Sequence, residues 1–410
     1  MNAPNLVHAA AEMAARQSYG KLVAWLAWKW RDVCAAEDAL SDAFVAALKK
    51  WPEDGIPHSP EAWLLTVAKR NLLMAARRKR LEGNPQVTML FPDLQVEPSP
   101  EPAIPDERLR LMFVCAHPAI DRSMHSALML QLVLGVDAAR IANAFLLSPS
   151  TLSKRLTRAK AKIRDAGIPF NEPEISEFPS RVESVLEAIY GAYTITDFIG
   201  SDFEMDGLTD EALFLAQLTS TQMPEFAEAH GLKALLLFCE SRRPARCDAE
   251  GTFVPLDRQD TGLWHMELVR AGESALARAA QLNRVGPYQI EAAIQSVHMQ
   301  CAFDGKTRWL EIRQLYEHLL QLEPTIGARI GHAIAVAKSE KNPEEGLKLL
   351  DAFEPSRVAA HQPWWATRAD LLCTLGRRQE ADEAYSRAIA LTSNESVQKW
   401  LTRKQGGLSY

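Results

Sequence analysis

Apolar residues recur at three- and four-residue spacing along almost all of the 410-residue chain, and alternating strand patterns are scarce. This spacing places apolar side chains on one face of an α-helix. The pattern therefore predicts an all-α fold. The one stretch that departs from it runs from Gly251 to Leu256, where we expect a loop or a brief hairpin.

Length and a change in composition divide the chain into several parts. At 410 residues it is too long for one ordinary domain. Residues 83–104 are rich in proline and acids and show no helical period, which predicts a flexible linker. We expect small helical domains on either side, at residues 1–82 and 105–170. A further helical domain is predicted at residues 178–290, and a repeat region at residues 291–410.

The repeat region carries weak internal repetition. Tyr316, Leu350 and Tyr385 recur at a spacing of about 34 residues, the period of tetratricopeptide repeats. In the last copy, Gly376 and Ala381 also lie at offsets typical of that repeat, whereas the earlier copies are degenerate. The spacing favours a tetratricopeptide-like array, with a generic helical bundle as the alternative.

A helix-turn-helix pattern ends in the strongly basic helix Ser150–Arg164. Asp137 is placed to cap a short first helix, and Ser148 to cap the second, which has Pro149 in its first turn. The stripe expected to face the core consists of Leu152, Leu156, Ala159 and Ile163. Elsewhere this helix carries six Lys or Arg residues and no acid. The layout predicts a DNA-recognition helix for the major groove.

The polar side chains of this helix divide by the contacts expected of them. Its N-terminal half would enter the major groove, where hydroxyl and basic groups reach base edges. The side chains that face away from the core there are Thr151, Ser153, Lys154, Thr157 and Arg158. Phosphate contacts, which position a helix without reading sequence, are expected of Arg155, Lys160 and Lys162. A solvated basic face remains the alternative.

Basic residues gather in the first part of an acidic chain. The formal net charge is -6. Residues 1–170 hold 22 Lys and Arg against 17 Asp and Glu, a net of +5, which leaves -11 for the other 240 residues. This asymmetry predicts that residues 1–170 bind a polyanion and that the rest of the chain has an acidic surface.

Two further helices are predicted before the linker. The first, Ala36–Trp51, has a packing stripe that consists of Ala39, Ala43, Phe44, Ala46, Ala47 and Leu48. The second, Pro60–Arg80, has Trp63 near its start and carries an acid-free basic cluster that comprises Lys69, Arg70, Arg77, Arg78, Lys79 and Arg80. Cations beside an aromatic ring suit single-stranded DNA, although a core position for Trp63 is an equal alternative.

Cysteine usage and hydropathy bound the compartment and the cofactors. The six cysteines are scattered without a CxxC pair, which indicates reduced thiols rather than a disulfide frame or a zinc site. No apolar run approaches the ~18 residues of a membrane span, and the N-terminal residues lack the pattern of a signal peptide. We expect a cytoplasmic protein with no metal, no cofactor and no membrane contact.

The order of these motifs resembles an extracytoplasmic-function sigma factor, a sigma-70-type subunit of bacterial RNA polymerase. Ala36–Trp51 resembles the region-two helix that docks on polymerase, and Pro60–Arg80 the helix that melts and reads the minus-ten element. Ser148–Arg164 resembles the region-four helix that reads the minus-thirty-five element. A subgroup with a long C-terminal extension is closer still, through motifs similar to DERLRLMFVCAHPAI, RRPARCDAEG, LDRQDTGLW and GPYQIEAAI.

The resemblance implies partners and the residues that contact them. Contacts with core RNA polymerase are implied for Glu37, Asp38, Asp42 and Phe44. Contacts with minus-ten DNA are implied for Lys69, Arg70, Asn71, Arg77 and Arg78. Contacts with minus-thirty-five promoter DNA are implied for Thr151, Ser153, Lys154, Arg155 and Arg158. A factor of this kind directs core polymerase to promoters and catalyses no reaction itself.

The chain departs from the family pattern in two places. The family commonly has an Asp where this chain has Ala75, just before the basic run. The subgroup usually has an acidic, glycine-bearing helix end where this chain has IYGAYTITDFIG. Both departures lie in segments to which the resemblance assigns a function.

Three classes of function remain open. The resemblance favours a sigma factor whose extension regulates it or recruits a protein partner. A helix-turn-helix regulator that acts without polymerase is one alternative, and a tetratricopeptide interaction scaffold is another. Asp257, Asp260 and His265 lie near several arginines in the sequence, but no nucleophile, phosphate loop or metal triad accompanies them. An Asp–Arg network that joins two helical subdomains is therefore preferred over an enzyme.

Overall fold

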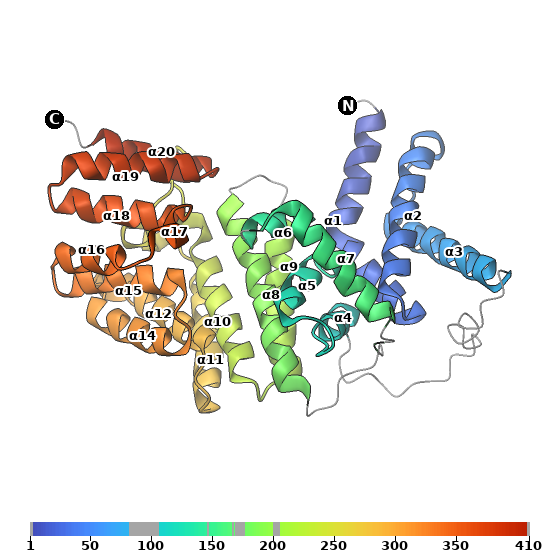
Figure 1. Cartoon of the computed structure of the whole chain (residues 1–410), viewed down its shortest axis with the longest axis horizontal. Helices are drawn as coiled ribbons and strands as arrows, with labels where there is room; N and C mark the ends of the chain where they lie inside the picture. Colours follow the sequence, from blue (N-terminus) through green and yellow to red (C-terminus); the bar gives the residue numbers. More distant parts are fainter. Residues whose placement is uncertain are drawn as a thin grey trace. The chain divides into compact units, whose positions relative to one another are not determined.

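Helices make up nearly all of the described chain (Figure 1). The computed structural model describes residues 3–81, 106–145, 147–165, 168, 177–199 and 206–407. Within those ranges the only β pairing is an isolated bridge between Cys247 and Phe253, in the stretch where a loop or hairpin was expected. The prediction of an all-α fold is confirmed. The predicted linker, residues 83–104, lies outside the described ranges.

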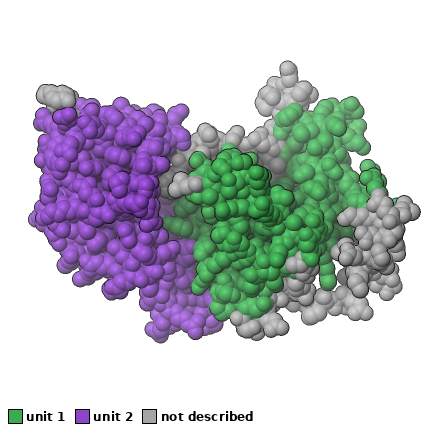
Figure 2. Space-filling model, in the orientation of Figure 1, with its two compact units in different colours: residues 1–195, 206–215 green, residues 196–205, 216–410 purple. Residues whose placement is uncertain are grey.

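The chain forms two compact units (Figure 2). Unit 1 comprises Met1–Ile195 and Asp206–Leu215, and unit 2 comprises Thr196–Met205 and Ala216–Tyr410. Helix α9 (Asp206–Gln222) contributes its first part to unit 1 and its remainder to unit 2. Within each unit, helices pack both on neighbours in sequence and on helices farther along the chain.

Unit 1 begins with a bundle of three long helices. These are α1 (Ala3–Trp30), α2 (Val33–Asp54) and α3 (Pro60–Leu81). The Asp32 carboxylate caps α2 by accepting the Ala35 N–H at 3.0 Å, and Gly55, with φ at +84°, ends that helix. Leu40, Trp51 and Leu64 lie in the core of the bundle, each at most 2% exposed. The bundle therefore has a continuous apolar centre that fixes the outer faces of α2 and α3.

Four shorter helices follow. They are α4 (Glu107–Cys115), α5 (Arg122–Leu132), α6 (Ala138–Ala144) and α7 (Pro149–Asp165). The first three each begin at an aspartate, Asp106, Asp121 or Asp137, whose carboxylate accepts backbone N–H groups of the first turn. Helix α7 packs on both α5 and α6, as the second helix of a helix-turn-helix does.

Residues 178–195 of helix α8 (Phe178–Ile199) belong to unit 1, where they contact α4 and α5. The buried His125 ring lies 3.0 Å from the Ser184 hydroxyl, and the Arg181 guanidinium donates to the Phe113 carbonyl oxygen at 3.3 Å. All four residues are buried. Helix α8 therefore belongs to the core around α4 and α5, on which α7 also packs.

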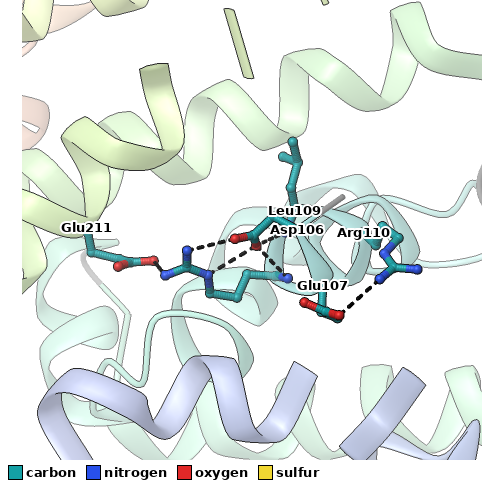
Figure 3. A network of polar contacts seen from close by, with 6 residues as sticks. Asp106, Glu107, Leu109, Arg110 and Glu211 are labelled. Carbon is teal, nitrogen blue, oxygen red and sulfur yellow. Dashed lines mark hydrogen bonds and ion pairs between the residues drawn. The ribbon is translucent and has the colours of Figure 1, made fainter. Parts of the chain in front are cut away.

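A polar network joins α9 to the start of α4 (Figure 3). The guanidinium of Arg108, only 6% exposed, pairs with Asp106 at 2.8 Å and with Glu211. Burial opposes ionisation of Asp106, but the hydrogen bonds and charge of Arg108 outweigh it, so that the pKa of this carboxyl is lowered. The neighbouring Arg110 pairs with Glu107 at 3.3 Å. Glu211 thus ties the start of α4 to α9, while the other pairs lie within the first turns of α4.

Unit 2 begins with α10 packed on two later helices. The helices are α10 (Ala227–Ser241), α11 (Met266–Gln281), α12 (Pro287–Met299) and α13 (Cys301–Asp304). Three single turns of 3-10 helix, Arg243–Ala245, Leu256–Arg258 and Thr261–Leu263, lie between α10 and α11. The Glu228 carboxylate of α10 accepts the N–H groups of Tyr288 and Gln289 at 2.9 and 3.0 Å, which caps α12. This contact gives the GPYQIEAAI motif a structural role.

The rest of unit 2 is a stack of helices in chain order. They are α14 (Trp309–Leu322), α15 (Ile326–Ser339), α16 (Pro343–Asp351), α17 (Pro355–Val358), α18 (Gln362–Thr374), α19 (Arg378–Leu391) and α20 (Glu395–Gly406). From α14 to α20, each of the longer helices packs on the next. Leu350 and Tyr385 lie at 0% exposure in one core, and Tyr316 packs against the preceding one. Two of the three residues that mark the repeat are thus fully buried, and Tyr316 packs at the edge of a core.

The segment between the 3-10 turns reaches the last helix of the stack. The Phe253 N–H donates to the Ser396 carbonyl oxygen at 3.1 Å, and the Phe253 ring meets Trp400 edge-on at 5.7 Å. Among the described residues, Asp257 pairs with Lys338 at 4.0 Å and Asp260 caps the following turn. These two acids therefore do not form the Asp–Arg network that the sequence suggested.

Candidate nucleic-acid interface

The core stripe of α7 is the one that the sequence predicts. Leu152, Leu156, Ala159 and Ile163 are all buried, at 7% exposure or less. Ser148 accepts the Thr151 N–H at 3.3 Å, as expected of the helix cap. Ile141 and Ala142 of α6 are buried as well, at 0% exposure. The buried side chains of α6 and α7 therefore fix which side of α7 faces outward.

The predicted minus-thirty-five contacts lie together on that outward side. Thr151, Ser153, Lys154, Arg155 and Arg158 are all exposed. No carboxylate in the described part of the chain forms a salt bridge with Lys154 or Arg158, so both cations are free to neutralise a bound anion. A row of hydroxyl and basic groups on one exposed helix face has the chemistry to contact base edges and phosphates.

Lys160 does not share that face, which corrects the prediction that it meets phosphate. Its ammonium lies 2.8 Å from the Glu37 carboxylate of α2, and the two side chains are only 17% and 15% exposed. Burial raises the pKa of Glu37, and the attraction of Lys160 offsets that rise only in part. Sequence reasoning missed this pair, because no local pattern connects two residues 123 positions apart.

The predicted minus-ten contacts on α3 divide between two faces. Arg70, Arg77 and Arg78 are exposed. The Lys69 ammonium lies 4.2 Å from the centre of the Trp25 ring, and Asn71 donates to the Ala39 carbonyl oxygen at 3.5 Å. Both of these side chains are half-buried. Lys79 and Arg80 lie outside the residues whose side chains the structure describes.

A groove of about 450 Å³ runs between α2 and α3. Its lining consists of Ala46, Lys50, Ala62, Trp63, Thr66, Val67 and Arg70. The Trp63 ring meets the buried Trp51 edge-on at 5.6 Å and still forms part of the groove wall. Trp63 is thus half-buried, so its ring combines a packing contact with an accessible face. An aromatic wall flanked by two cations has the composition of a base-stacking site.

The predicted polymerase-docking residues lie on α2 with unequal exposure. Asp38 and Asp42 are exposed and Phe44 is half-buried, whereas Glu37 is covered by Lys160. Leu48 is 39% exposed, so its place in the predicted packing stripe was wrong. With Val45, which is 50% exposed, it forms an apolar patch that sequence reasoning missed. Helical spacing carried the signal, because Val45 lies about 200° around the helix from the buried Ala43.

Neither a cluster of metal-binding side chains nor a membrane-spanning helix occurs among the described residues. No group of three or more His, Cys, Asp or Glu side chains there is arranged to hold a metal ion. No helix in the described part of the chain combines the length and the apolar character that a membrane crossing requires.

Two parts of the chain match known protein families. Residues 16–82 match the family model of sigma-70 region 2, which covers α2, α3 and the second half of α1. Residues 181–280 match a family of unknown function. The chain is 30% identical over 176 residues to the probable RNA polymerase sigma factor RfaY of Xanthomonas campestris pv. campestris. The match covers 39% of this chain. That match covers 42% of the relative.

The three-helix bundle matches sigma-70 region 2, which supports a sigma-70-type factor as the class of this chain. More narrowly, it belongs to the same family as the uncharacterized protein R00370 of Rhizobium meliloti (strain 1021). The two are 36% identical over 376 residues, which cover 90% of this chain and 88% of that protein.

Proposed function

We propose that the chain is an extracytoplasmic-function sigma factor that binds core RNA polymerase and directs it to particular promoters. The observation that carries this proposal is the pairing of a sigma-70 region 2 with the exposed basic face of α7, held outward by a buried stripe. A helix-turn-helix regulator that acts without polymerase does not need a sigma-70 region 2. An interaction scaffold needs neither that region nor an exposed basic face on α7. The chain itself catalyses no reaction, since polymerase supplies the chemistry.

The exposed faces of α7 and α3 contact different promoter elements in this proposal. The α7 face reads the minus-thirty-five element through Thr151, Ser153, Lys154, Arg155 and Arg158. The α3 face and its groove take the opened minus-ten strand, with Lys50 and Arg70 near the backbone and Trp63 near a base. Lys69 and Asn71 support that surface from its half-buried side. The apolar patch on α2 and the exposed Asp38 and Asp42 dock on polymerase.

Transcription in vitro tests the proposal. Purified chain is mixed with core polymerase and genomic fragments, and start sites are mapped. We expect discrete starts that require both proteins, with core polymerase retained when the chain is captured. Failure of the chain to retain core polymerase, together with specific binding to duplex DNA by the chain alone, would favour a regulator that acts without polymerase.

Arg158→Ala tests the recognition helix. If Arg158 reads a base, holoenzyme binding to the cognate promoter weakens by about 1–3 kcal/mol, and a promoter changed at that base no longer responds. If it meets only phosphate, all sequences weaken alike and the log–log salt slope drops by roughly one. Arg270→Ala, which removes an exposed cation from α11, is the matched control. Equal promoter affinity for both variants would remove Arg158 from the interface.

The C-terminal part has a regulatory role in this proposal. The helical stack from α12 to α20 supports a tetratricopeptide-like array at residues 291–410, after a family-specific domain at residues 178–290. Arrays of that kind present a surface to a peptide or protein partner. The proposed setting is the cytoplasm, where polymerase and promoter DNA are the other partners.

A further inference from the structure

In unit 2, the chain between α10 and α11 forms a tight loop of its own before it meets the helical stack. The Val254 N–H donates to the Arg246 carbonyl oxygen at 2.8 Å, and the Asp248 N–H donates to the Thr252 carbonyl oxygen at 2.9 Å. The Asp248 carboxylate also accepts the Thr252 N–H at 2.7 Å. These bonds fix the shape of the loop independently of the stack. Residues 246–260, which contain the loop, are called the connecting segment below.

One face of α20 receives this loop. Four residues of α20 contact it, and their spacing of three and four places them on one side of the helix: Ser396, Lys399, Trp400 and Arg403. The Ser396 carbonyl oxygen accepts the Phe253 N–H at 3.1 Å, and the Phe253 ring meets the Trp400 ring edge-on at 5.7 Å. The Lys399 ammonium donates to the Glu250 carbonyl oxygen at 3.4 Å. Backbone and aromatic contacts of this kind are those that a bound peptide makes.

Charge complements the contact on both sides of Phe253. The Arg403 guanidinium of α20 pairs with the Asp248 carboxylate at 3.1 Å. Farther along the connecting segment, the Asp257 carboxylate lies 4.0 Å from the Lys338 ammonium of α15. The segment therefore reaches two helices of the stack and places an acid beside a cation on each of them.

These contacts hold the connecting segment only weakly. The Asp248 and Arg403 side chains are 31% and 57% exposed, and exposed ion pairs contribute little to stability. The Thr252 hydroxyl, in a residue that is 2% exposed, has no hydrogen-bond partner in the described part of the chain. An unpaired buried hydroxyl disfavours the docked arrangement. The contact of Phe253 with Trp400 is thus the main anchor, and another peptide that offers the same groups can displace the segment.

We infer that this face of α20 is a docking site for a protein partner that offers an extended segment with an aromatic side chain between acidic residues. In the free protein, the connecting segment occupies the site in place of that partner. The partner's aromatic ring takes the position of Phe253 against Trp400, and its carboxylates pair with Arg403 and Lys338. The inference rests on the role proposed for the C-terminal part and names the chemistry of its partner.

A fluorescein-labelled peptide with the sequence of residues 248–260 tests the site by fluorescence anisotropy. In the full chain, the connecting segment competes with this peptide at the high effective concentration of a tethered ligand. Phe253→Ala removes the anchor of the competitor, so we expect this variant to bind the peptide about 10-fold more tightly than the wild type does. Leu263→Ala, which changes a side chain that is 50% exposed just beyond the segment, is the matched control. Equal affinity of the wild type and Phe253→Ala, or no binding by either, would overturn the inference.

Further substitutions in the Phe253→Ala chain locate the bound peptide. Trp400→Ala should abolish binding, and Arg403→Glu should weaken it several-fold, because the site loses its ring or reverses its charge. Arg357→Glu, at an exposed position of α17, is the charge control. Circular dichroism confirms that the compared chains are folded. Undiminished binding by both Trp400→Ala and Arg403→Glu would place the peptide elsewhere and refute the assignment.

Zero-length carbodiimide cross-linking measures whether the connecting segment is docked. This chemistry joins an amine to a carboxylate in contact, so mass spectrometry should find Lys338 linked to Asp257 in the wild type. The Lys404–Asp370 pair within the stack, at 2.7 Å, is the internal standard. We expect Phe253→Ala to reduce the first product several-fold and to leave the standard unchanged. An undiminished first product would show that the ring does not anchor the segment, which contradicts the inference.

The inference and the proposed function fail separately. Anisotropy and cross-linking use neither polymerase nor DNA, so a chain that does not bind the peptide leaves the sigma function intact. Failure of the chain to retain core polymerase would overturn the proposed function and leave the peptide measurement unaffected.

Discussion

The basic residues of α7 do not share one role, although the sequence presents them as one run. Lys154 and Arg158 face outward, whereas Lys160 lies close to the stripe of Leu156 and Ile163, which directs it toward α2. Arg164 pairs with the adjacent Asp165 at 2.9 Å. The charge available to DNA is therefore smaller than the run of six suggests. Arg158 is the residue whose loss tests that interface most directly.

His298 is a residue of unit 2 whose ionisation is coupled to stability. Burial, and to a lesser extent the charge of Arg242, lowers the pKa of its imidazole to about 4. The neutral ring meets Trp309 edge-on at 5.6 Å. Because the folded pKa lies below the unfolded value of about 6.5, the unfolded chain binds the proton more readily between these two pH values. Stability from this group is thus present above pH 6.5 and lost as pH falls toward 4.

We predict that His298→Gln reduces the acid sensitivity of unit 2. Between pH 7 and pH 5 the wild-type chain should lose about 1–2 kcal/mol of unfolding free energy through this group, and the variant should not. Urea unfolding followed by tryptophan fluorescence at the two pH values measures the difference. His318→Gln, at an exposed position of α14, is the matched control. An identical pH dependence in wild type and His298→Gln would contradict the prediction.

At the scale of helices, the sequence predicts elements better than it predicts the contacts between them. Apolar spacing located α7 and its stripe, and capping residues located the starts of α6 and α7, because these signals are local. The Lys160–Glu37 pair joins α7 to α2, and Gly20 of α1 lies against the Val133 carbonyl oxygen after α5. No local pattern contains either contact. The same limit explains Leu48. Its spacing fits the predicted packing stripe of α2, but no neighbouring helix in the described part of the chain covers it, and it is 39% exposed.

Glycines in unit 2 allow a second close approach between helices, and the sequence alone does not show which helices approach there. Gly231 of α10 lies so close to α12 that a Cβ atom would stand 2.8 Å from the Gln289 backbone nitrogen. Gly286, just before α12, lies similarly close to the Glu228 carboxylate that caps the helix. These two glycines allow the junction that holds α10 against α12.

Gly231→Ala should therefore destabilise unit 2 by about 1–3 kcal/mol, since the backbone of α12 must move to admit one methyl group. Gly327→Ala in α15, with nothing within 4 Å of its Cβ position, should be neutral or slightly stabilising. Urea denaturation of both variants measures the two free energies. If the two substitutions shift the unfolding midpoint equally, the close approach of α10 and α12 does not limit stability.

For the molecule as a whole, the packing of α8 changes how the role of the C-terminal part should be tested. A chain that ends at residue 175 lacks α8, whose Arg181 and Ser184 contact Phe113 of α4 and His125 of α5 in the core of unit 1. It also lacks Glu211, the partner of Arg108. A chain that ends at residue 222 keeps all of these contacts and removes most of unit 2.

We predict that residues 1–175 unfold at a lower temperature than residues 1–222, with a free energy of unfolding lower by about 3 kcal/mol or more, because removal of α8 exposes buried apolar surface. Differential scanning calorimetry measures both transitions, with the full chain as the reference. Equal melting midpoints for the two truncated chains would show that α8 is dispensable.

Transcription by residues 1–222 and by the full chain, compared at several salt concentrations, then separates autoinhibition from loss of fold. If the acidic C-terminal part restrains the basic helices, the shorter chain is more active at low salt and the difference shrinks as salt screens the charges.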